Sequence, residues 1–265
     1  MVPPADMVEV GRPGCRSRIG RLQSVRIAEL YASLQGEGLL AGTPSTFVRT
    51  SGCNLRCHWC DTPFTSWRPG GEERSIDAIR KAVDDLGLSH VVLTGGEPLL
   101  PADAGELCAR LRLDGHHLTV ETAGTVLPGG VPAEDLADLM SVSPKLVSSA
   151  PPPDTPGDWH ERHSRSRRRD DVLEALLRAP QWQLKFVVDT PDDLAEVIAW
   201  LDDLDAAGVG GEGGLPRDRV FVMPQGTNPA TLAATSQWLE SACHAEGLRL
   251  APRHHIAWFG NTRGT

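Results

Sequence analysis

Short apolar runs alternate with helix-like segments along most of this chain, and this alternation limits the folds available to it. Strand-like runs are expected at 25–31, 45–49, 91–93, 118–120, 139–142, 184–188, 220–223 and 248–250. Between them, Ile76, Ile79 and Val83 repeat at helical spacing, with Ser75 as N-cap and Gly87 just past the end. Alternating strands and helices with short connections predict an α/β fold, a mostly parallel sheet covered by helices.

Two further helices are predicted from their first residues. Thr190-Pro191 places a capping hydroxyl before a proline, and two aspartates follow in the first turn. Asn228-Pro229 repeats the pattern and predicts a helix that runs to about Gly247.

Most of the apolar runs finish in polar or glycine-rich residues. In parallel α/β folds, the carboxyl ends of the strands form the functional face. We therefore expect one shared site built from these endings, which are Thr94-Gly95-Gly96-Glu97, Glu121-Thr122, Ser143-Pro144-Lys145, Met223-Pro224-Gln225 and Arg253-His254-His255.

Composition narrows the class of protein. The chain has 265 residues, of which 40% are apolar, enough for one good core. Its net charge of −9 gives no reason to expect nucleic-acid binding. No window approaches 18 uninterrupted apolar residues, and the N-terminus lacks the apolar stretch of a secretory signal. The expected location is therefore cytoplasmic, without a membrane or nucleic-acid partner.

Two segments depart from the alternation. Residues 1–24 have no periodicity and are predicted to form a flexible tail. Residues 151–171 are rich in proline and arginine, and they are expected to be a solvated, even disordered, insertion; the alternative is a lid or a docking site. One domain is expected over 25–265.

The cysteines indicate metal or cluster chemistry. Cys53, Cys57 and Cys60 form a C-x3-C-x2-C pattern, whereas Cys15, Cys108 and Cys243 are scattered. A structural zinc site would need a fourth ligand, normally from a second pair of ligands, and no such pair is evident. A [4Fe–4S] cluster held by three cysteines leaves one iron open to bind a reactant. Zinc and uncoordinated thiols remain the alternatives.

The triad resembles the cluster motif of the radical S-adenosylmethionine (SAM) superfamily. Gly95-Gly96-Glu97-Pro98, at a strand end, is similar to that superfamily's GGEP motif. Several further segments resemble the 7-carboxy-7-deazaguanine synthase family: Ser33-Leu34-Gln35-Gly36-Glu37-Gly38, Phe47-Val48-Arg49, Trp59-Cys60-Asp61-Thr62, Ser143-Pro144-Lys145, Gln183-Leu184-Lys185-Phe186 and Met223-Pro224-Gln225-Gly226. This resemblance implies a partial (β/α)6 TIM-like barrel and a homodimer.

The resemblance also implies an activity. Such enzymes are carbon–nitrogen lyases of queuosine biosynthesis that convert 6-carboxy-5,6,7,8-tetrahydropterin to 7-carboxy-7-deazaguanine with loss of ammonia. The implied cofactors are a [4Fe–4S] cluster, SAM and Mg²⁺, and the implied partner is a flavodoxin-like or ferredoxin-like reductant.

Residue roles are implied position by position. The resemblance implies that Cys53, Cys57 and Cys60 hold the cluster and that Thr62 binds Mg²⁺. The SAM site is implied to include Trp59, Gly95, Gly96, Glu97, Glu121, Ser143, Pro144, Lys145 and Gln225. Substrate contacts are implied for Leu34, Gln35, Gly36, Glu37, Arg49, Thr94, His255 and the terminal Thr265. Purely structural alternatives are a salt bridge for Arg49, a turn acid for Glu37 and a satisfied histidine for His255.

Two other functions fit parts of the pattern. A protein that activates a glycyl-radical enzyme would share the cysteine triad and the GGEP segment, but it would not need the Leu34–Glu37 loop or Arg49 to grip a pterin. A non-catalytic module that binds a metal or a cluster, with the arginine-rich insertion contacting a partner, would take up zinc or hold a cluster indifferent to SAM.

Overall fold

A computed structural model of the chain describes residues 23–260 and 262–264, and within them the expected sheet forms. Its nine strands lie in the order β3-β1-β2-β4-β5-β6-β7-β8-β9, and β2 pairs in parallel with β4, as does each following neighbour up to β9. The strands are β1 (Ser24–Leu34), β2 (Pro44–Thr50), β3 (Glu72–Ser75), β4 (His90–Gly95), β5 (His117–Thr122), β6 (Leu139–Val142), β7 (Gln181–Val188), β8 (Val220–Pro224) and β9 (Arg249–Leu250). Because β3 and β9 are its two edges, this sheet is open, as a partial barrel requires.

An antiparallel extension was not predicted. β1 pairs antiparallel with both β2 and β3, so the chain turns back on itself before the parallel series begins. The residues of β3, Glu72-Glu73-Arg74-Ser75, carry no apolar alternation that would signal a strand. Ser24, assigned above to the tail, is the first residue of β1. Gln23, also assigned to the tail, accepts a hydrogen bond from the Ile76 N–H. Residues 1–22 of the predicted tail lie outside the described residues.

Local capping chemistry explains where the helices begin. The Ser75 side chain accepts the Ala78 N–H, and Gly87 closes the helix with φ 68°. Thr190 and Asp193 form a reciprocal capping box, and Asn228 accepts two N–H groups of the helix that follows. These three predicted helices are confirmed. The helices are α1 (Ile76–Leu86), α2 (Ala104–Leu113), α3 (Trp159–Ser166), α4 (Asp170–Leu176), α5 (Pro191–Ala206), α6 (Pro229–Ala245) and α7 (His254–Phe259).

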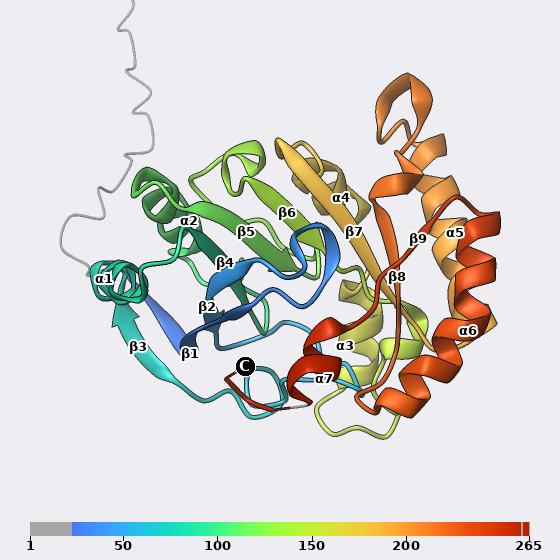
Figure 1. The fold of residues 1–265 in the computed structure, drawn as a ribbon, viewed down its shortest axis with the longest axis horizontal. Coiled ribbons are helices and arrows are strands. Elements are labelled where there is room, and N and C mark those ends of the chain that lie inside the picture. The colour runs from blue at the N-terminus through green and yellow to red at the C-terminus, as the bar shows by residue number, and fades with distance from the viewer. Residues whose placement is uncertain (1–22, 261, 265) are drawn as a thin grey trace, which may run out of the picture.

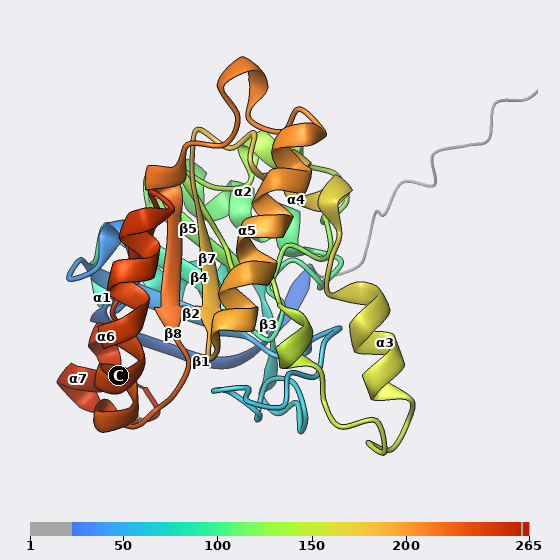
Figure 2. The same cartoon turned by 90° about the vertical axis from the view of Figure 1, so that its right-hand side faces the viewer.

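The helices cover one side of the curved sheet. In Figures 1 and 2, α1, α2, α4, α5 and α6 lie outside the strands, while α7 lies toward the end where β8 finishes. Buried side chains of β4 to β8 and of these helices form one apolar core, with Leu93, Leu107 and Phe186 fully enclosed. Among the described residues, no helix is long and apolar enough to cross a membrane.

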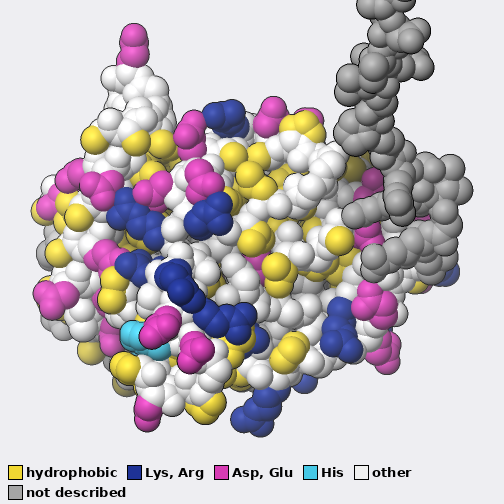
Figure 3. Space-filling view, turned by 180° about the vertical axis from the view of Figure 1, so that it is seen from behind, with side chains coloured by type: hydrophobic (Ala, Val, Ile, Leu, Met, Phe, Trp, Pro, Cys, Tyr) yellow, Lys and Arg dark blue, Asp and Glu magenta, His cyan; other side chains and the backbone are white. Residues whose placement is uncertain are grey.

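The arginine-rich insertion is folded, which corrects the expectation of a disordered stretch. Residues 159–166 form α3, and α4 begins at Asp170. Ion pairs link Arg167 to Glu196, Arg168 to Asp170 and Asp203, and Arg169 to Asp171. Seen from behind, Lys and Arg side chains lie in a band with acidic side chains beside them (Figure 3). The sequence pattern did not predict α3 because His163 is its one fully buried side chain. A longer amphipathic helix would show a repeating apolar stripe.

Candidate active site

A cavity of about 490 Å³ opens where the parallel strands end. Its walls come from β1, β2, the cysteine segment, the ends of β4 and β5, β7 and the C-terminal segment. Most of the predicted site residues line it: Leu34, Gln35, Gly36, Glu37, Arg49, Cys53, Cys57, Trp59, Cys60, Thr62, Thr94, Gly95, Gly96, Glu121, Ser143, Lys145 and His255. Residues from several of the strand endings therefore line one cavity.

Two glycines at the end of β4 hold the start of the cysteine segment. Gly96 N–H donates to Thr50 O, and Glu97 N–H donates to Gly52 O. A Cβ on Gly96 would lie 2.7 Å from the Gly52 carbonyl carbon and 2.9 Å from Thr65 O, closer than real Cβ atoms come. Gly95 has φ 146°, a conformation that L side chains rarely adopt. These glycines therefore let two backbone segments pack together, a role separate from ligand approach.

The three cysteines are free thiols on the cavity wall. Burial raises the pKa of Cys53 to about 12 and that of Cys57 to about 11. In the part of the chain that the structure describes, no group of three or more His, Cys, Asp or Glu side chains is arranged to hold a single metal ion. Three unpaired thiols that face one enclosure fit a larger cluster, whose iron charge would deprotonate them on binding.

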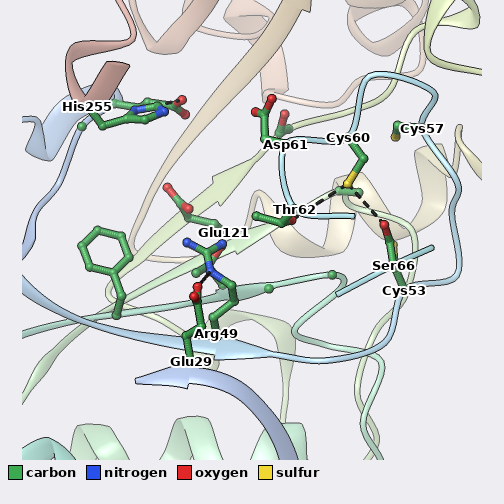
Figure 4. Close-up of a pocket in the computed structure, with 18 of the residues that line it drawn as sticks. Glu29, Arg49, Cys53, Cys57, Cys60, Asp61, Thr62, Ser66, Glu121 and His255 are labelled. Carbon is green, nitrogen blue, oxygen red and sulfur yellow. Dashed lines mark hydrogen bonds and ion pairs between the residues drawn. The ribbon is translucent and has the colours of Figure 1, made fainter. Parts of the chain in front are cut away.

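Hydroxyl groups lie beside the last cysteine. Cys60 Sγ is 3.3 Å from Ser66 Oγ and 3.9 Å from Thr62 Oγ1, and all three side chains face the cavity (Figure 4). Thr62 Oγ1 also accepts from Thr65 Oγ1 at 3.2 Å. An aliphatic hydroxyl oxygen is a donor of the kind that a hard cation prefers.

Arg49 lies across the cavity from the cysteines, held by two partners. Its Nε donates to Glu29 Oε2 at 2.9 Å, and its Nη2 donates to the Tyr31 hydroxyl at 2.9 Å. The side chain is 16% exposed. The structural salt bridge foreseen as an alternative is thus present, yet Arg49 also lines the cavity, where its guanidinium lies between Glu29 and Glu121 (Figure 4).

A buried lysine connects two strands, β5 and β7, with the loop that follows β1. Lys185 on β7 donates to Glu37 Oε2 at 3.0 Å and to Glu121 Oε1 at 3.1 Å, and Gln35 Nε2 donates to the same Glu121 oxygen at 3.1 Å. Burial alone would raise the pKa of Glu37, but Lys185, Arg253 and His255 hold it well below its usual range. Burial lowers the pKa of Lys185, and Glu121 and Glu37 more than reverse that, so it stays charged.

The C-terminal segment contributes a cation, Arg253, which was expected in the shared site as part of a strand ending but was given no role of its own. Arg253 donates to Glu37, to the Asp61 carboxylate beside Cys60 and to the Gly226 carbonyl. His255, which follows on α7, lies 3.7 Å from Glu37 Oε1, whereas His254 stacks on Trp258. Gly36 packs so closely on His255 that a Cβ would overlap the imidazole.

A group of missed residues surrounds Arg49. Glu29, Tyr31, Phe47, Phe64 and Arg263 line this side of the cavity. Arg263 pairs with Glu29 and lies over the Phe64 ring. Each is unremarkable in its local sequence, so only the fold could reveal it. Lys185 had a weak signal, as one of three lysines in an arginine-rich chain.

Glu97, which the resemblance assigns to the SAM site, does not line the cavity. Its side chain is fully buried and accepts from Leu99 N–H, Thr122 Oγ1 and Ala123 N–H. It therefore ties the end of β4 to the end of β5. Pro144 and Gln225 likewise fall outside the lining, and Thr265 lies outside the described residues.

Comparison with known proteins gives this geometry a family. A model described as the radical SAM superfamily matches residues 47–191. The curated 7-carboxy-7-deazaguanine synthase of Rhodopirellula baltica is 42% identical over 91% of this chain and 89% of its own. That of Halobacterium salinarum is 43% identical over 90% and 92%. The crystal structure of QueE from Escherichia coli superposes with a TM-score of 0.62 at 23% identity, covering 88% of this chain and 95% of that one.

The open parallel sheet and the three free cysteines at its carboxyl edge therefore define a radical SAM protein. Within that superfamily, the identities over nine-tenths of the chain are decisive. The chain belongs to the 7-carboxy-7-deazaguanine synthase family.

Proposed function

We propose that this chain converts 6-carboxy-5,6,7,8-tetrahydropterin to 7-carboxy-7-deazaguanine with release of ammonia. One observation carries the proposal: the cavity that holds three free cysteines is also lined by paired charges, Arg49 with Glu29 and Lys185 with both Glu37 and Glu121. A protein that acts on the backbone of another protein has no need for such an enclosed, charge-lined space.

These paired charges suit a substrate with one anionic end and one guanidine-like edge. The guanidinium of Arg49 offers a planar fork to the substrate carboxylate, which would take over the place of Glu29. Glu37 and Glu121 are acceptors for the N–H groups of the pterin edge, and the ammonium group of Lys185 bonds to both carboxylates and holds them in place. Leu34, Gly36, Thr94 and His255 complete this wall.

The three cysteines would hold the cluster. When bound, the cluster and SAM would supply the radical chemistry that removes a hydrogen atom from the substrate. SAM contacts are assigned in this proposal to Trp59, Gly96, Ser143 and Lys145, which line the cavity. The ammonium group of Lys145 is held by Ser143 O and Oγ at 2.7 and 2.8 Å, so it is already oriented.

Three accessory features belong to the same proposal. Thr62 would bind Mg²⁺ through its hydroxyl, with the substrate carboxylate as another ligand. A flavodoxin-like or ferredoxin-like protein would supply the electron, and the enzyme would work as a homodimer in the cytoplasm.

The test is an anaerobic assay after reconstitution with iron and sulfide. Dithionite, SAM, Mg²⁺ and the pterin are supplied, and 7-carboxy-7-deazaguanine is sought by mass spectrometry. We expect product from the wild type and from Cys243→Ala, a buried thiol on α6 outside the cavity, but none from Cys57→Ala. Cleavage of SAM without the deazaguanine would refute the substrate. A colourless protein that takes zinc and ignores SAM would refute the whole proposal.

A further inference from the structure

The folded insertion reaches back to the cysteine segment through one buried histidine. His163 on α3 has no exposed surface, and its Nδ1 lies 3.2 Å from the backbone nitrogen of Arg56. Its Nε2 lies 2.9 Å from Ser149 Oγ. Arg56 stands between Cys53 and Cys57, so His163 bonds to the backbone in the middle of the triad.

The partners of His163 determine its tautomer. The Arg56 N–H can only donate, so Nδ1 must accept, and the proton of the neutral ring must lie on Nε2. The Nε2–H then donates to Ser149 Oγ, and that hydroxyl donates to Leu146 O at 2.6 Å. Arg56, His163, Ser149 and Leu146 thus form one chain of hydrogen bonds in which every donor has an acceptor.

Further contacts hold the same stretch. The Arg56 guanidinium lies 3.9 Å from the centre of the Trp159 ring, and the Arg162 guanidinium lies at the same distance from that ring. Arg56 also donates to the carbonyls of Cys53 and Leu55 at 2.8 and 2.7 Å. One residue further on from Cys57, His58 N–H donates to Ser149 O at 3.1 Å. The insertion therefore contacts the segment through the His163 side chain and the Trp159 ring, and Ser149, just before the insertion, adds a backbone hydrogen bond.

We propose that His163 is a positioning residue for the cluster: by accepting the Arg56 N–H, it fixes the backbone that sets the spacing of Cys53 and Cys57. The thiolates of a cluster site must keep fixed relative positions, and groups that orient ligands commonly change metal affinity by about 10–100-fold when they are removed. The inference rests on the proposed function only in requiring a cluster at these cysteines, and the pterin plays no part in it.

Two variants of similar shape test the two ring nitrogens of His163 separately. In His163→Asn, the side-chain oxygen can occupy the place of Nδ1 and still accept from Arg56. In His163→Gln, the side-chain nitrogen can occupy the place of Nε2 and still donate to Ser149, while the bond to Arg56 is lost. His163→Leu loses both bonds. Each variant is reconstituted, and three properties are measured: the rate of cluster loss to an iron chelator, the midpoint potential with the electron paramagnetic resonance spectrum, and the Tm of the metal-free chain.

We expect cluster loss to be about 10–100-fold faster in His163→Gln and His163→Leu, and within about threefold of wild type in His163→Asn. The midpoint potential and spectrum should follow the same division. The Tm should fall in both the Asn and Gln variants, because each leaves one buried partner unbonded.

Equal cluster loss in the Asn and Gln variants, or rates that simply follow Tm, would overturn the proposal and leave His163 as a packing residue. Equal retention in all three variants would also overturn it. If the wild type holds no cluster, the proposed function fails together with this inference. If the wild type holds a cluster that is insensitive to these changes, this inference alone fails.

Discussion

Gly96→Ala is a test of whether the GGEP glycines serve packing or ligand approach. The new methyl group would lie 2.7 Å from the Gly52 carbonyl carbon and 2.9 Å from Thr65 O, and all the nearest atoms belong to the backbone. Such atoms cannot rotate away as a flexible side chain can. The segment must therefore move, which strains the hydrogen bonds from Gly96 N–H to Thr50 O and from Glu97 N–H to Gly52 O.

Overpacking of this kind costs about 1–3 kcal/mol of the free energy of unfolding. For a chain of this length each kcal/mol lowers Tm by about 2–4 °C, so we expect a decrease of about 2–12 °C. The measurement is thermal unfolding of the metal-free protein by circular dichroism, which involves neither cluster nor SAM. Gly129→Ala is the matched control, since a Cβ there meets nothing within 4 Å and should leave Tm nearly unchanged.

The two explanations then give different results. If Gly96→Ala unfolds at the same temperature as Gly129→Ala but no longer binds SAM, the packing argument is wrong and the glycine serves the ligand alone. If Tm falls and reconstituted cluster content falls with it, the glycine acts through the cysteine segment.

Two further changes test the buried charges. Lys185→Met should lower the free energy of unfolding, measured in urea, by about 3–5 kcal/mol, because the Glu37 and Glu121 carboxylates lose their shared ammonium group. The control is Lys81→Met, an exposed lysine on α1, which should change this free energy by under about 0.5 kcal/mol. Equal effects of the two substitutions would contradict the argument. Burial, together with neighbouring positive charges, lowers the pKa of His163 from 6.5 to about 4, so the folded state binds this proton less readily than the unfolded state. The neutral His163 therefore contributes stability that is present above pH 6.5 and is lost as the pH falls toward 4. The Tm of the metal-free chain should accordingly fall more steeply over that range in wild type than in His163→Asn, and parallel curves would show that His163 titrates normally.

Most of the fold could be predicted from local patterns. Caps such as Ser75 and Thr190 act within three residues, and a buried strand shows itself as an apolar run, so elements of these kinds were found close to their true bounds. β3 was missed because its four residues are polar and its pairing with β1 depends on a segment some 50 residues earlier. The insertion was misjudged for a similar reason, since the contacts that order α3 are made with Arg56 and Ser149 rather than within the helix.

The site shows the same division between local and long-range information. Cysteines at fixed spacing are visible in the sequence because one local segment must supply the three ligands. The groups that complete the cavity come from opposite ends of the chain: Glu29 pairs with Arg49 and Arg263, and Glu37 pairs with Lys185 and Arg253. Glu29 therefore finds Arg49 on the neighbouring strand β2, whereas Glu37 meets its cations only once β7 and the segment that begins at Arg253 are in place. A partly folded chain without these elements would leave Glu37 unpaired, so the last strands and the C-terminal segment complete the charge balance of the site as well as the sheet.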